Sequence, residues 1–72
     1  MNLFAKRIKS LRNDKKLLQK DIANLLGITE RQYRDYEAGK VDPPTSRTIK
    51  LADYFDVSID YLVGRSDDPK RS

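Results

Sequence analysis

The residue types in this chain limit the chemistry that it could perform. There is no cysteine and no histidine among the 72 residues, which removes the most reactive nucleophile and the commonest acid–base group and metal ligand at neutral pH. The acidic side chains of the last third lack the alternating oxygen ligands and the glycine of a calcium loop, so we interpret them as solvated acids and helix caps. These residues are Asp53, Asp56, Asp60, Asp67 and Asp68. We therefore expect no catalytic residue, no metal site and no cofactor.

What remains is the binding chemistry of charged side chains, with positive charge in excess. The chain has 15 Lys and Arg against 11 Asp and Glu, a formal net charge of +4. Up to Pro44 there are ten basic and six acidic residues, and from Thr45 onward there are five of each. Spread over a whole surface, such an excess would only solvate it. Its concentration in residues 1–44 favours a surface that binds phosphate groups.

The elements that must position these charges lie in residues 19–37, where two short helices are predicted. The first is amphipathic, because its apolar residues recur at helical spacing. They are Ile22, Ala23, Leu25 and Leu26, with Lys20, Asp21 and Asn24 on the other face. Gly27 follows the last apolar residue, where a helix usually ends on a residue of positive φ that glycine adopts at little cost.

The second helix of this pair begins with a capping box. The hydroxyl of Thr29 can accept a hydrogen bond from the Gln32 backbone N–H, while the Gln32 side chain reaches back to the Thr29 N–H. Ile28 and Tyr33 stand at the two positions of a hydrophobic staple, which would fix the angle at which the chain enters the helix. Two helices joined by a glycine-containing turn form a helix-turn-helix.

The pattern resembles the Cro and phage-repressor type of helix-turn-helix domain (the Xre family). The resemblance is carried by Gln19, Ile22, Ala23, Leu26, Gly27, Ile28, Thr29, Tyr33, Tyr36, Glu37, Gly39 and Lys40. It extends from Arg7 and Ile8 to the closing Val57-Ser58 and Leu62, and so covers most of the chain. It implies an all-α, compact, five-helix, lambda-repressor-like DNA-binding domain, with the helix-turn-helix at the second and third helices.

We expect this domain to span residues 1–64, with the motif at about 18–37, and residues 65–72 to be a polar tail or the start of a linker. Asn2 can cap a first helix that ends near residue 13, and its inward stripe is Phe4, Ile8 and Leu11. A fourth helix is predicted at residues 45–55. Its inward residues are expected to be Ile49, Ala52 and either Leu51 or Phe55.

The resemblance also implies structural roles for Arg12, Glu37 and the turn residue Gly27. The family places an arginine at the position of Arg12 that pairs with the glutamate ending the third helix, here Glu37. Leu18 departs from the family pattern, which has serine, threonine or asparagine as the cap of the second helix. Leucine cannot accept the unpaired N–H groups there, so we expect a helix start weakened by roughly 1 kcal/mol.

The residues expected at base edges open the third helix, because a recognition helix places its N-terminal residues in the major groove. Arg31 is the expected reader, since a guanidinium matches the two acceptors of guanine. Glu30 and Asp35 can only accept, and so suit the amino group of cytosine or orient a neighbouring arginine. Glu30 could equally be a first-turn carboxylate favoured by the helix dipole. For Gln32 we favour the capping role.

Phosphate contacts are expected nearby. Gln19 opens its helix, where the backbone N–H and the amide can bind a phosphate, as the family's glutamine does. Arg34, Lys40 and, more weakly, Arg47 are further candidates. Tyr33 and Tyr36 are expected in the core. The full expected DNA-binding set is Gln19, Thr29, Glu30, Arg31, Arg34, Asp35, Lys40 and Arg47.

Three classes of function compete. The leading one is a sequence-specific regulator that binds double-stranded DNA, a bacterial or phage repressor acting as a homodimer on a two-fold operator in the cytoplasm. The alternative is an antitoxin or other partner-binding module that uses the same domain, although such a module needs surface beyond that domain. An enzyme is disfavoured, because the chain offers no activated nucleophile or metal-centred site. No apolar run reaches the length of a membrane span or of a signal-peptide core.

Overall fold

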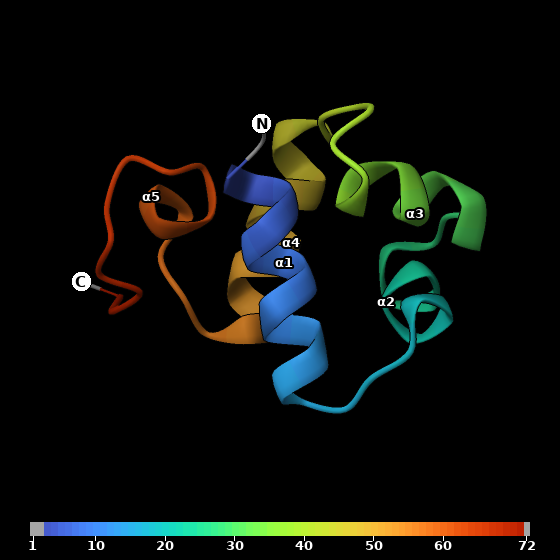
Figure 1. Ribbon diagram of the computed structural model, residues 1–72, viewed down its shortest axis with the longest axis horizontal. Helices are drawn as coiled ribbons and strands as arrows, with labels where there is room; N and C mark the ends of the chain where they lie inside the picture. The colour runs from blue at the N-terminus through green and yellow to red at the C-terminus, as the bar shows by residue number, and fades with distance from the viewer. Residues whose placement is uncertain (1–2, 72) are drawn as a thin grey trace.

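The computed structural model describes residues 3–71, and this part of the chain contains helices and turns but no strand (Figure 1). In chain order the helices are α1 (Leu3–Asp14), α2 (Gln19–Leu26), α3 (Glu30–Glu37), α4 (Thr45–Phe55) and α5 (Ile59–Leu62). The predicted all-α, five-helix fold is confirmed. The predicted cap Asn2 lies outside the described residues. None of these helices is long and apolar enough to cross a membrane.

The helices surround one apolar core. In Figure 1, α1 and α4 lie in the middle, α2 and α3 on one side and α5 on the other. α1 packs against both α3 and α5, while α2 packs against α3 and α4 against α5. The largest fully buried side chains are Ile8, Ile22, Tyr33, Leu51 and Leu62, so all five helices contribute to this core. The α2–α3 pair therefore packs on the rest of the domain chiefly through α1, and Arg47 of α4 adds a hydrogen bond to the Tyr36 hydroxyl of α3.

The α2–α3 turn has the geometry that its sequence predicts. Gly27 has φ +70°, and a Cβ there would meet no atom within 4 Å, so the backbone angle alone favours glycine. Thr29 Oγ1 accepts from the Gln32 N–H at 3.1 Å, and Gln32 Oε1 accepts from the Thr29 N–H at 3.0 Å. Ile28 packs against the core in which Tyr33 is buried. These local contacts fix the bounds of both helices.

The start of α2 differs from the family pattern, as the sequence indicates. Leu18 has extended backbone angles and makes no side-chain cap hydrogen bond. However, the Asp21 carboxylate accepts from the Leu18 backbone N–H at 2.8 Å. This bond is the returning half of a capping box, and it compensates in part for the missing hydroxyl.

The bounds predicted for α4 are confirmed, but one of its inward residues was wrong. Ile49 is 42% exposed, whereas both Leu51 and Phe55 are buried together with Ala52. Thr48 completes the stripe, because positions 48, 51, 52 and 55 follow the i, i+3, i+4, i+7 spacing of one helical face. This rotation of the helix buries two large side chains and leaves Ile49 at the edge. Of the stripe predicted for α1, Phe4 and Ile8 are buried, and Leu11 packs against the core.

Residues 65–71 lie against the helices. Arg7 of α1 donates to the carbonyl oxygens of Tyr61 and Ser66, the latter at 2.7 Å, and its guanidinium lies 4.0 Å from the centre of the Tyr61 ring. Arg71 donates to the Ala52 carbonyl at 3.2 Å, near the end of α4. Two arginines thus attach this segment to the domain, one from α1 and one from the segment itself.

Candidate nucleic-acid interface

The helix α3 has two chemically different faces. Tyr33 and Tyr36 are 0% and 5% exposed and meet edge to face, with ring centres 6.3 Å apart. The prediction that both tyrosines belong to the core is confirmed. Because these positions point inward, Glu30, Arg31 and Arg34 are exposed on the outer side of the helix. Burial of the tyrosines therefore determines which side chains α3 presents to a partner.

The exposed face of α3 carries one paired and one unpaired arginine. Arg34 Nη2 lies 3.2 Å from Glu30 Oε2, and both side chains are about half exposed. Within residues 3–71, Arg31 has no ion pair or side-chain hydrogen bond, so its guanidinium is available to a ligand. Glu30 thus contacts Arg34 and is also the acidic residue in the first turn of α3, so both of its expected roles remain predictions. Asp35 is half-buried beside them.

A buried ion pair fixes the opposite side of α3. Arg12 of α1 binds Glu37 through both carboxylate oxygens, with Nε–Oε2 at 2.7 Å and Nη2–Oε1 at 3.0 Å. Their side chains are only 11% and 3% exposed. Gln19 joins them, because its Nε2 donates to Glu37 Oε1 at 3.1 Å. The pair that the resemblance implies is present. With Gln19, it links the last turn of α1, the start of α2 and the end of α3.

The electrostatics of this cluster favour a charged pair beside a neutral phenol. Burial works against the charged form of Glu37, but hydrogen bonds from its neighbours, Arg12 first among them, outweigh burial and lower its pKa. The hydrogen bond to Glu37 raises the pKa of Arg12. Burial raises the pKa of Tyr33, and the nearby Glu37 carboxylate adds to the effect. The Tyr33 hydroxyl is buried and forms no well-aligned hydrogen bond within the described residues.

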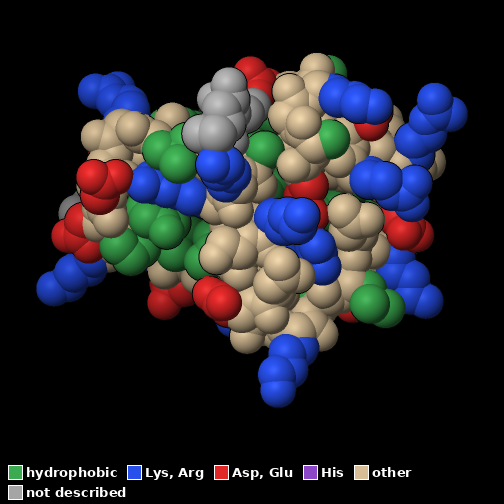
Figure 2. Space-filling view, viewed as in Figure 1, with side chains coloured by type: hydrophobic (Ala, Val, Ile, Leu, Met, Phe, Trp, Pro, Cys, Tyr) green, Lys and Arg blue, Asp and Glu red, His purple; other side chains and the backbone are tan. Residues whose placement is uncertain are grey.

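The remaining candidate residues lie around the α2–α3 pair and differ in how exposed they are and in whether they already have a hydrogen-bond partner. Gln19 is the first residue of α2, and the Thr29 hydroxyl is engaged in its cap. Lys40 is exposed just beyond Gly39, whereas Arg47 is half-buried and donates to the Tyr36 hydroxyl at 2.8 Å. Figure 2 shows several Lys and Arg side chains around the α2–α3 end of the molecule. Residues distant in sequence are thus brought to one side of the fold.

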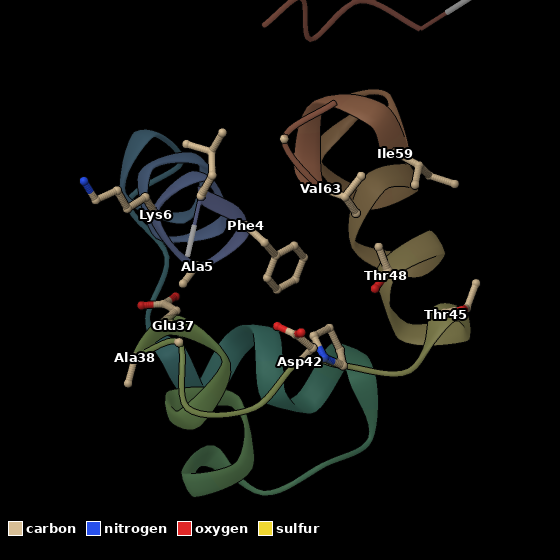
Figure 3. A pocket seen from close by; sticks show the side chains of 14 residues that line it. Phe4, Ala5, Lys6, Glu37, Ala38, Asp42, Thr45, Thr48, Ile59 and Val63 are labelled. Carbon is tan, nitrogen blue, oxygen red and sulfur yellow. The ribbon is translucent and has the colours of Figure 1, made fainter. Parts of the chain in front are cut away.

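A separate open groove of about 1180 Å³ lies between α1, the α3–α4 loop, α4 and α5 (Figure 3). Phe4 and Thr48 point into it from facing helices, and the apolar side chains of Leu3, Ile59 and Val63 line its edges and are partly exposed. No group of acidic residues in the described chain is arranged to hold a metal ion. The groove combines these apolar side chains with polar ones, among them Lys6, Asp42 and Thr45.

Sequence reasoning missed three contributions. Asp21 supports the start of α2, Gln19 binds the Arg12–Glu37 pair, and Arg7 links α1 to the segment after α5. The spacing of Asp21, three residues after Leu18, is the one local signal that could have indicated its role. The other two contacts join residues 18 and 59 positions apart, for which one sequence gives no signal.

Comparison with known proteins agrees with this geometry. A family model described as helix-turn-helix matches residues 8–62. The transcriptional regulator YobD of Bacillus subtilis is 37% identical over 67 residues, which are 93% of this chain and 60% of that protein. The cryptic phage CTXphi transcriptional repressor RstR of Vibrio cholerae is 34% identical over 65 residues, 90% of this chain and 59% of RstR.

A solved structure is similar as well. A crystal structure of a transcriptional regulator from Listeria innocua superimposes with a TM-score of 0.84 at 36% identity, covering 89% of this chain and 60% of that one. The chain thus spans at most about 60% of the length of the relatives named here. With the capped α2–α3 turn, the inward tyrosines and the matched family model together, the chain belongs to the helix-turn-helix family, of the Cro and phage-repressor type.

Proposed function

We propose that this protein binds double-stranded DNA in a sequence-specific manner and regulates transcription, as a repressor in the cytoplasm of a bacterial or phage-infected cell. The observation that carries the proposal is the outer face of α3, where Arg31 is exposed and has no side-chain partner within residues 3–71, on a helix whose other face is buried in the core. A rigid helix that presents an unpaired guanidinium suits the major groove, where arginine pairs with guanine.

Each candidate residue has a role in this proposal. Arg31 reads a base edge, and Glu30 orients Arg34, which lies within reach of the backbone or of a base one turn further along. Asp35 accepts from a base amino group or from a neighbouring arginine. The residues assigned to phosphate and backbone contacts are Gln19, Thr29, Lys40 and Arg47. Such contacts place the protein on the duplex but carry no sequence information themselves.

We also propose that the protein acts as a homodimer on a two-fold operator. Two recognition helices then read half-sites about one helical turn, or roughly 34 Å, apart. The exposed apolar side chains of Leu3, Ile59 and Val63 support this proposal, because a second copy that contacts α5 and the start of α1 leaves the outer face of α3 uncovered. Sedimentation of the protein with an operator duplex should give two chains per duplex.

The proposal is tested by binding to a panel of duplexes at one fixed salt concentration. The preferred site is first selected from random duplexes, and each base pair is then changed singly. Arg31→Ala should leave folding nearly unchanged, cost roughly 1–3 kcal/mol at the preferred site and relax the preference at one base pair in each half-site. Arg65→Ala is the matched control, since it removes the same charge from an exposed position beyond α5.

Two results would contradict the proposal at different levels. If wild type and Arg31→Ala gave the same base-preference profile, Arg31 would not be a reader. If the wild-type protein showed no preference among duplexes, sequence-specific regulation would be wrong, and a partner-binding module would be the better description.

A further inference from the structure

We propose that Glu37 is a positioning residue for DNA binding, because its carboxylate holds the Gln19 side chain where it contacts a phosphate. The inference rests on the proposed function and deepens it. It assigns a role in DNA affinity to a side chain that is 3% exposed and therefore cannot touch DNA itself.

The contacts place Glu37 at the centre of a clamp on the start of α2. One carboxylate oxygen, Oε1, accepts from Gln19 Nε2 at 3.1 Å and from Arg12 Nη2 at 3.0 Å, and the other accepts from Arg12 Nε at 2.7 Å. Arg12 Nη1 also donates to the Leu17 carbonyl at 2.8 Å. The buried pair therefore holds the chain on both sides of Leu18.

The charge of Glu37 determines how the Gln19 amide is oriented. An ionised carboxylate only accepts hydrogen bonds, so Gln19 must turn its NH₂ group, and not its oxygen, toward Glu37. One amide hydrogen is donated to Glu37, and the second remains for another acceptor. A phosphate oxygen is such an acceptor, and an amide already held in place loses less rotamer freedom when it binds.

The start of α2 has no side-chain cap from its N-cap residue, so this clamp adds to its support. Leu18 supplies no side-chain acceptor, so only the Asp21 carboxylate caps the helix from within. α2 has eight residues, and a helix of that length is not stable without tertiary contacts. The Arg12–Glu37 pair thus holds the first residues of α2 in place, which a capping hydroxyl does in other helices.

The test is a double-mutant cycle of DNA affinity. Dissociation constants of wild type, Gln19→Ala, Glu37→Gln and the double variant are measured on the preferred duplex, with concentrations corrected for the folded fraction by circular dichroism. A glutamine at position 37 has one acceptor oxygen for the donors that the carboxylate serves with two, and so cannot hold both Arg12 and Gln19 as before. Asp53→Asn is the control, because it removes a carboxylate paired with Arg71, on α4.

We expect each single variant to bind about tenfold more weakly, the size of one lost charge-assisted hydrogen bond. The double variant should bind no more weakly than Gln19→Ala alone, and Asp53→Asn should bind like wild type. Two losses that multiply in the double variant, or wild-type affinity of Glu37→Gln, would overturn the inference while leaving the proposed function intact. Failure of the wild-type protein to bind any duplex would instead refute the proposed function, and the inference with it.

A second measurement needs no variant, and so stands even if Glu37→Gln does not fold. Nitrogen-15 relaxation reports the mobility of side-chain amides in the free wild-type protein. The Gln19 NH₂ group should be clearly more ordered than that of Asn24, an exposed amide on the same helix. Equal mobility of the two amides would overturn the inference, since Glu37 would then not be positioning Gln19 before DNA arrives.

Discussion

Removing either partner of the Arg12–Glu37 pair should destabilise the fold severely. Both side chains are nearly buried, at 11% and 3% exposure, and each hydrogen-bonds the other through two atoms. Alanine at one position leaves the other charge buried without its counter-ion, which costs roughly 3–5 kcal/mol. Glu37→Ala also removes the acceptor of the Gln19 amide, so we expect it to fall at the upper end of that range.

This loss is large relative to the total free energy of unfolding. At about 0.05–0.15 kcal/mol per residue, a chain of this size has a free energy of unfolding of roughly 4–11 kcal/mol. A single alanine variant should therefore lose between about a quarter and all of this free energy of unfolding. The double variant leaves no unpaired charge, so it should be more stable than the sum of the two losses predicts, by about 2 kcal/mol.

Urea unfolding followed by far-ultraviolet circular dichroism measures all four stabilities, with a stabilising osmolyte added equally where a variant is partly unfolded. The exposed pair Glu30–Arg34 provides a matched cycle on the same helix, for which we expect a coupling of no more than about 0.5 kcal/mol. Strict additivity of the Arg12 and Glu37 losses would refute the reasoning. So would equal coupling in the buried and exposed cycles, because burial would then not govern the strength of the pair.

Three further outcomes are expected. Lys40→Ala should weaken binding to all duplexes alike and reduce the slope of log affinity against log salt by about one unit; a wild-type slope would remove Lys40 from the phosphate contacts. Because the pKa of Glu37 is lowered on folding, the unfolded chain takes up its proton first, so the stability from this group is present at neutral pH and lost as pH falls below about 4.5. Glu37→Gln should therefore lose less stability than wild type between pH 7 and pH 3, as measured by urea titration at each pH. Arg7→Ala should cost about 2 kcal/mol in urea, while Asp67→Asn should change little, since that carboxylate is almost fully exposed; similar losses would contradict this.

The ends of a helix could be predicted where they depend on residues close together in the sequence. The start of α3 is the clearest case. Thr29 and Gln32 are three residues apart and satisfy each other, so the cap needs no knowledge of the fold. The φ of Gly27 is likewise a local requirement. The resemblance supplied the Arg12–Glu37 contact, which spacing alone could not have indicated.

Contacts between distant segments, and the rotation of a helix, could not be predicted in this way. Ile49 and Leu51 are both apolar, and only the packing of α4 against the other helices decides which is buried. The residues next to Arg7 in the sequence do not indicate its partners, yet it contacts residues 54 to 60 positions further along. Its role depends on where α5 ends, which the residues of α1 do not specify.

The two faces of α3 explain how fold and recognition can be determined independently. Tyr33, Tyr36 and Glu37 are held by the core and by Arg12, and they set the position of the helix axis. Glu30 and Arg31 are exposed, so changing them should alter what the helix presents without moving it. Under the proposed function, the sequence preference of this protein has to be sought in the exposed residues of its own α3, Glu30, Arg31 and Arg34.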